Sequence, residues 1–151
     1  MVIIYGVKNG LKMKKHKIIL DDFRDNFDVY WILRDPIFFD EDWIIVKNVD
    51  ELIKVVVEIQ NKNEEIEIIS FDNDLVDEHY SFLLNESFFN PTTLEVLFEQ
   101  TKQRTGFEGL IWFVEYYKFN NIELPKILIH TQNFNARKVM KKFLKENERS
   151  N

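Results

Sequence analysis

The stretch EIEIISFDND, residues 65 to 74, combines an apolar run with an abrupt polar end. Its isoleucines predict a buried strand. Asp72 and Asp74 follow that strand with a single residue between them. Two interpretations are open: the carboxylates belong to a functional site, or they only end the strand, as Asp and Asn commonly do.

Three further runs are rich in isoleucine and share this apolar character, and they cover residues 17–20 (KIIL), 43–46 (WIIV) and 126–130 (KILIH). Apolar runs without clean alternation are typical of strands that are covered on both faces, as in a parallel sheet. Amphipathic helical patterns lie between and after these runs, beginning near Asn48, Thr105 and Ala136. Strands that alternate with helices predict an α/β fold, a three-layer sandwich with a mainly parallel central sheet.

With 151 residues and 45% hydrophobic content, the chain predicts a single domain over residues 1–151, with a core at about 17–145. Two segments fit the alternating pattern poorly and are expected to be insertions, at about 25–42 and 76–104. Within the first, VYWIL favours an extra edge strand; within the second, a helix is expected after Pro91. VIIYGV near the N-terminus is an ambiguous further strand.

Composition excludes several classes of protein. The absence of cysteine excludes disulfides and thiolate chemistry, and no apolar stretch has the length of a membrane helix, so the expected location is the cytoplasm. A net charge of -6 disfavours extended binding along a nucleic-acid backbone. A local pocket for one phosphate is compatible with this charge. A protein partner is compatible with these properties.

Polar residues follow three of the four predicted strands. They are Asp21, Asp22 and Arg24 after the first strand, Ser70, Asp72, Asn73 and Asp74 after the third, and His130, Thr131, Gln132 and Asn133 after the last, with Arg137 on the next helix. The carboxyl ends of parallel strands meet at one edge of the sheet, so these groups are expected to lie close together. Clustered carboxylates repel one another unless a cation intervenes, and we expect Asp21, Asp22 and Asp72 to hold Mg²⁺ or Mn²⁺.

His130 is a candidate general acid or base, because the pKa of a histidine side chain lies near neutrality. A histidine at a strand end is also often a structural hydrogen-bonding group. Thr105 precedes Gly106 at the start of a predicted helix, where free backbone amides could bind a phosphate. An ordinary helix N-cap is the alternative at Thr105.

Five motifs in order resemble the cyclic-phosphate processing receiver-like family, a divergent branch of the response-regulator receiver fold, over about residues 17 to 141. They are ILDDFR, WIIVKNVDELIKVV, IISFDNDL, TGFEGLIWFVEYYKFNNIELPKILIHTQN and ARKVM. The resemblance implies a receiver- or flavodoxin-like sandwich. It also implies metal binding by Asp21 and Asp22, and it places either Asp72 or Asp74 where receivers are phosphorylated, without deciding which.

At the last strand, His130, Thr131 and Asn133 match the family motif, and Arg137 matches a basic residue of the following helix. The chain departs from the family in three places, with Asn73 where histidine is usual, Phe134 where proline is common and Ala136 where glycine is. No lysine follows the last strand as it does in ordinary receivers, which disfavours signalling through an aspartyl phosphate.

These features lead to two main hypotheses of function. The first is a metal-assisted phosphoesterase acting on the cyclic phosphate of a nucleotide or RNA end. Asp72, Asp74 and His130 are its catalytic candidates, and its candidate phosphate-binding residues are Arg24, Thr105, Thr131, Asn133 and Arg137. The alternative is a non-catalytic receiver-like module that binds a phosphorylated or nucleotide ligand or a protein partner.

Overall fold

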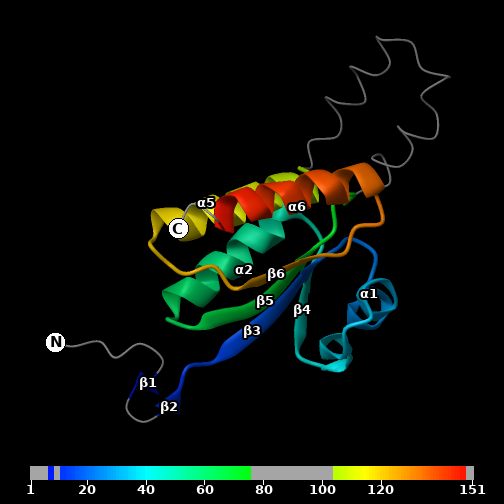
Figure 1. The fold of residues 1–151 in the computed structure, drawn as a ribbon. Helices are drawn as coiled ribbons and strands as arrows, with labels where there is room; N and C mark the ends of the chain where they lie inside the picture. The colour runs from blue at the N-terminus through cyan, green and yellow to red at the C-terminus, as the bar shows by residue number, and fades with distance from the viewer. Residues whose placement is uncertain (1–6, 9–10, 76–103, 149–151) are drawn as a thin grey trace, which may run out of the picture.

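The computed structural model describes residues 7–8, 11–75 and 104–148 (Figure 1). The strands are β1 (Val7–Lys8), β2 (Leu11–Lys12), β3 (Lys15–Leu20), β4 (Trp43–Val46), β5 (Glu65–Phe71) and β6 (Lys126–Ile129). The helices are α1 (Asn26–Leu33), the 3-10 helix η1 (Pro36–Phe39), α2 (Val49–Asn61), α5 (Gly106–Phe119) and α6 (Phe134–Glu148). None of these helices is long and apolar enough to cross a membrane.

The central sheet has the order β4-β3-β5-β6, and every neighbouring pair is parallel. Hydrogen bonds to neighbouring strands continue one residue beyond three of the strands. Asp21 N–H donates to Val46 O, Asp72 N–H to Leu20 O and His130 N–H to Phe71 O, at 2.9 to 3.0 Å. The backbone of the first polar residue after each of these strands is therefore fixed by a hydrogen bond to the neighbouring strand.

Helices cover both faces of the sheet, which confirms the predicted three-layer α/β architecture. One face packs against α2, α5 and α6, and the opposite face packs against α1 and η1 (Figure 1). The larger core contains apolar side chains from all four strands and these three helices, including Phe71, Phe113 and Met140. The smaller core contains Val29 and Phe38.

The prediction of an edge strand at VYWIL is wrong, because this sequence lies inside α1. Asp25 begins the helix with a capping box: its side chain accepts a hydrogen bond from Asp28 N–H, and the Asp28 side chain accepts one from Asp25 N–H. The aromatic and β-branched residues of VYWIL have high strand propensity, but the cap and the packing of Val29 against the sheet favour a helix. The predicted helix after Pro91 and residues 1–6 lie outside the described residues.

The N-terminus of α5 lies against the end of β5. Gly106 N–H donates to Asn73 O at 2.8 Å, and a Cβ atom at Gly106 would lie only 1.5 Å from the backbone oxygen of Asp72. Glycine is therefore required where the helix begins. This contact fixes the backbone that carries Asp72.

Gly106→Ala is expected to destabilise the fold by about 2 kcal/mol or more, because backbone at Asp72 and Asn73 must move to admit the methyl group. Gly109→Ala on the same helix is the matched control, since its Cβ would approach flexible side chains of Leu20 and Val49 at 3.2 Å. Urea unfolding of both variants measures the difference. Equal stabilities would contradict the proposed requirement at Gly106.

Candidate functional site

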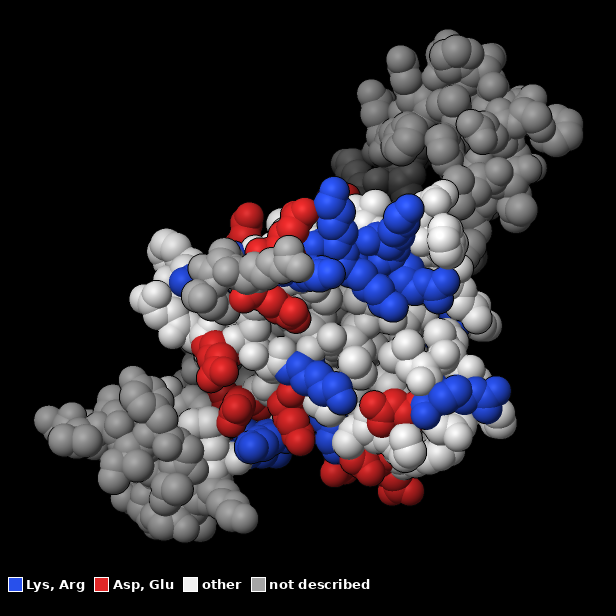
Figure 2. All heavy atoms as spheres, viewed as in Figure 1, with Lys and Arg blue, Asp and Glu red and all other residues white. Residues whose placement is uncertain are grey.

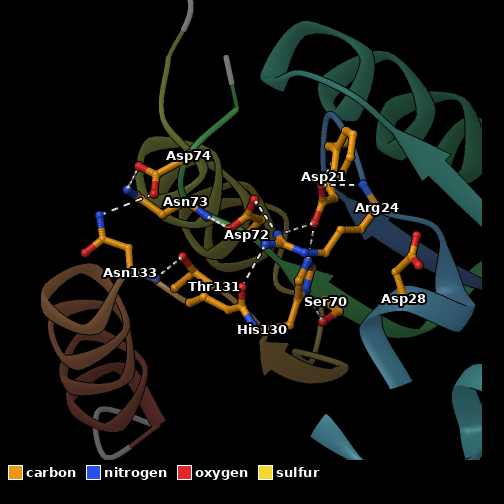
Figure 3. Close-up of polar contacts among 12 residues, drawn as sticks. Asp21, Arg24, Asp28, Ser70, Asp72, Asn73, Asp74, His130, Thr131 and Asn133 are labelled. Atoms are coloured by element: carbon orange, nitrogen blue, oxygen red, sulfur yellow. Dashed lines mark hydrogen bonds and ion pairs between the residues drawn. The ribbon is translucent and has the colours of Figure 1, made fainter. Parts of the chain in front are cut away.

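The polar residues that follow β3, β5 and β6 lie together at one edge of the sheet (Figure 3). Asp21, Asp72 and His130 are almost fully buried within this group. The parallel register places these three side chains beside one another, because each follows the last residue of its strand. The strand order of the fold thus creates the site.

Asp21 accepts hydrogen bonds from two elements of the fold. Its Oδ1 accepts from the backbone N–H groups of Phe23 and Arg24 at 2.9 and 2.8 Å, which orders the turn after β3. Its Oδ2 lies 2.9 Å from His130 Nε2 and 3.3 Å from Arg24 Nη1. Burial raises the pKa of Asp21, but the hydrogen bonds from His130 and the two backbone N–H groups outweigh burial, so its pKa is lowered from 3.8.

His130 lies between Asp21 and Ser70. Its Nε2 faces the Asp21 carboxylate, which can only accept, so Nε2 carries a proton. Its Nδ1 lies 2.7 Å from Ser70 Oγ, whose hydroxyl donates to it when the ring is neutral. Both ring nitrogens are therefore used within the protein, and the ring is fully buried. This geometry orients Asp21 and leaves His130 no nitrogen free for a substrate.

Asp72 is less well compensated than Asp21. Its Oδ1 accepts from Asn73 N–H at 2.8 Å, and its Oδ2 lies 3.5 Å from Arg24 Nη1. Burial and the nearby Asp21 charge raise the pKa of Asp72 from 3.8 to about 6. The two neighbouring carboxylates therefore titrate in different ranges.

A divalent metal ion fits the donor set of this site. Carboxylate oxygens of Asp21, Asp22 and Asp72 lie within 4.8 Å of one another, the only such acidic group in the described part of the chain. Hard cations such as Mg²⁺ prefer oxygen ligands of this kind. Arg24 Nη1 contacts both Asp21 and Asp72, so its positive charge lies where an ion would neutralise these acids.

Asp74 belongs to a separate group of polar residues. Its Oδ1 accepts from Asn73 Nδ2 at 3.1 Å and its Oδ2 from Asn133 Nδ2 at 3.3 Å. Asn133 Oδ1 in turn accepts from Ala136 N–H at 3.1 Å and caps α6. Within the described residues, the structure thus groups Asp72, and not Asp74, with Asp21 and Asp22.

The other predicted phosphate-binding residues have structural contacts. Thr105 Oγ1 accepts from Glu108 N–H at 3.3 Å and caps α5, and Thr131 Oγ1 accepts from Asn133 N–H at 3.2 Å. The Arg137 guanidinium lies 5.8 Å from the centre of the Phe134 ring. Thr105 and Arg137 lie at the starts of α5 and α6, and Thr131 lies between β6 and α6.

Two residues contribute more to the site than the sequence indicated. Ser70 hydrogen-bonds the His130 ring, and Gln132 Oε1 accepts from Arg24 Nη2 at 3.1 Å. Ser70 carried a usable signal, because a polar residue inside a buried apolar strand needs a partner. Gln132 was expected only as one of the polar residues after the last strand, and nothing in the sequence paired it with Arg24, which is distant along the chain.

Comparison with known proteins identifies one family. The family model described as cyclic-phosphate processing receiver domain matches residues 16–146. No curated protein and no solved structure matches the chain. The matched range begins at the second residue of β3 and covers the rest of the central sheet and the strand ends that form the site.

Asp72→Asn is expected to stabilise the metal-free protein at pH 7 by on the order of 2 kcal/mol. Folding raises the pKa of Asp72 from 3.8 to about 6, so the native state binds more protons between these values and its stability falls as pH rises. The gain should therefore vanish below about pH 4. Urea unfolding with a chelator, with exposed Asp42→Asn as control, tests this; a gain that does not change with pH would contradict it.

Arg24→Gln is expected to tighten Mg²⁺ or Mn²⁺ binding by up to about tenfold, because it removes a positive charge next to two metal-binding carboxylates. Calorimetry on the parent and the variant measures the change. Arg34→Gln is the control, since Arg34 stacks 4.5 Å from the Trp31 ring. Weaker metal binding by Arg24→Gln would show that Arg24 supports the ion.

Proposed function

Because the chain belongs to the cyclic-phosphate processing receiver domain family, we propose that it is a metal-assisted phosphoesterase that opens the cyclic phosphate of a nucleotide or RNA end. The observation that carries the proposal is the convergence of Asp21, Asp22 and Asp72 beside Arg24. Carboxylates in this arrangement suit a divalent cation, and an adjacent guanidinium suits phosphate oxygens.

The proposed reaction is the addition of water to phosphorus, with cleavage of the bond from phosphorus to one ribose oxygen. Mg²⁺ or Mn²⁺ at Asp21, Asp22 and Asp72 would neutralise charge on the phosphate and lower the pKa of bound water. One proton leaves the attacking water, and one proton reaches the departing ribose oxygen. The product is a phosphate monoester.

Asp72 is the proposed proton carrier. Asp72 is also a candidate ligand of the ion, and its carboxylate oxygen that does not bind the ion would be placed to take the proton from water and return it to the ribose oxygen. His130 is instead a positioning residue, because it holds Asp21 Oδ2 in place through Nε2. Asp74 is also a proposed positioning residue, because it accepts a hydrogen bond from the Asn133 side chain.

Arg24 is the proposed first contact for the phosphate. Its guanidinium is partly exposed and already contacts two of the acids, so release from them would present paired N–H donors to phosphate oxygens. Thr131 and Asn133 border the same strand end and are proposed to contact a bound phosphate. Thr105 and Arg137 are proposed contacts at the starts of α5 and α6.

A non-catalytic binding module is the second candidate. The observation that favours it is the closed hydrogen-bond network: both nitrogens of His130 are used, and Arg24 lies between Asp21 and Asp72. Such a network could hold a phosphorylated ligand without any proton transfer. The family description alone does not separate the two candidates.

Turnover of cyclic phosphates with added Mg²⁺ or Mn²⁺ is the test. Phosphorus NMR on 2',3'-cyclic nucleotides, cyclic dinucleotides and RNA ends should show opening to a monoester by the parent. Asp72→Asn should reduce the rate at least about 100-fold, since it removes the proton carrier. The exposed Asp42→Asn control should retain the parent rate.

The absence of turnover with every substrate and ion would reject the phosphoesterase. Ligand binding without product would then support the binding module. An Asp72→Asn variant as active as the parent would reject the role of Asp72 while leaving the reaction intact.

A further inference from the structure

Helix α6 concentrates positive charge in a chain whose net charge is -6. Its sequence contains five basic and two acidic residues. Lys138, Lys141, Lys142 and Lys145 have the spacing i, i+3, i+4 and i+7, which places them on one side of the helix. All four side chains are exposed, and we call these lysines the basic face of α6.

The four lysine side chains of the basic face are directed to solvent. No ion pair among the described residues includes any of its four lysines. Figure 2 shows Lys and Arg side chains gathered over α6. The opposite side of the helix buries Met140 and Leu144, so the packing that fixes α6 also fixes the direction of these lysines.

This helix starts at the candidate site. Asn133, which hydrogen-bonds Asp74, caps α6 directly after the polar residues that follow β6. Between Phe134 and Lys145 the helix rises about 16 Å, which is enough for a few nucleotides. The basic face therefore forms a continuous path that leads away from the acidic cluster.

An exposed aromatic ring stands at the beginning of this path. Phe134 is 66% exposed, and the Arg137 guanidinium lies 5.8 Å from its ring centre. Aromatic and arginine planes that stack bases, next to lysines that contact phosphates, are the combination by which proteins bind single-stranded nucleic acid. A lipid headgroup or an acidic peptide would use the lysines but give the exposed ring no base to stack on.

We propose that the basic face of α6 binds the backbone of single-stranded RNA and directs its cyclic-phosphate end into the site at Asp21, Asp22 and Asp72. The choice of RNA rests on the proposed function, because a 2',3'-cyclic phosphate requires the ribose 2'-hydroxyl. The net negative charge of the whole chain predicts against extended backbone binding, but binding along one helix depends on local charge. Phe134 stacks a base near the RNA end.

The test compares Lys138→Gln/Lys142→Gln with Lys54→Gln/Lys62→Gln. The control pair removes the same charge from exposed lysines at α2. Fluorescence anisotropy measures binding of a labelled single-stranded oligoribonucleotide that ends in a cyclic phosphate. We expect the α6 variant to bind the oligoribonucleotide about tenfold more weakly. The slope of log binding constant against log salt concentration should become shallower by about 1.4, because two phosphate contacts are lost at about 0.7 each. The control should bind like the parent.

Kinetics give a second measurement. The α6 variant should show a raised KM for the oligoribonucleotide with unchanged kcat, and unchanged turnover of a cyclic mononucleotide. Equal RNA binding by both double variants would overturn the proposal. Binding of anionic vesicles that depends on Lys138 and Lys142, without RNA binding, would also overturn it and would identify a membrane surface instead.

The two proposals fail separately. RNA binding that depends on the basic face, without opening of any cyclic phosphate, rejects the phosphoesterase and supports the RNA surface. Turnover of cyclic mononucleotides, with RNA bound no more tightly by the parent than by the α6 variant, rejects the RNA surface and supports the phosphoesterase.

Discussion

The buried carboxylate of Asp21 is the constraint on which the site depends. An isolated charge in such a position is costly, and here it is compensated by two backbone N–H groups, His130 and Arg24. That compensation orders the turn after β3 and, through His130 and Ser70, links it to β5 and β6. Asp72 receives less of this support, so its pKa is raised to about 6 while that of Asp21 is lowered.

This asymmetry links stability to the proposed chemistry. A carboxylate with a raised pKa destabilises the native state at neutral pH. The burial and the neighbouring negative charge that raise the pKa of Asp72 would, however, favour the binding of a cation. Arg24 partly offsets the repulsion between Asp21 and Asp72. A divalent ion would take over that electrostatic task and leave the guanidinium available to an anion.

The sequence predicted much of the fold because four apolar runs and their polar ends follow directly from the geometry of a parallel sheet. The sequence-based prediction was wrong at VYWIL, whose residues have high strand propensity. The Asp25 capping box and the tertiary packing of this segment favour a helix instead. The sequence could not separate Asp72 from Asp74, since spacing does not show that Asn133 engages the second. Nor could it show that both nitrogens of His130 are occupied, because Ser70 and Asp21 become its neighbours only in the folded sheet.

If the acidic cluster binds a divalent ion and the basic face of α6 binds RNA, as proposed, substrate binding depends on the ion. Without a cation, a phosphate near Asp21, Asp22 and Asp72 meets like charge, while the rest of an RNA strand is attracted by the lysines of α6. With a cation bound, both ends of the path would attract the strand. Each ligand then favours the other by the same free energy, and this coupling needs no change of conformation. An RNA end would therefore bind more tightly when the ion is in place, and the ion would bind more tightly when the RNA end is in place.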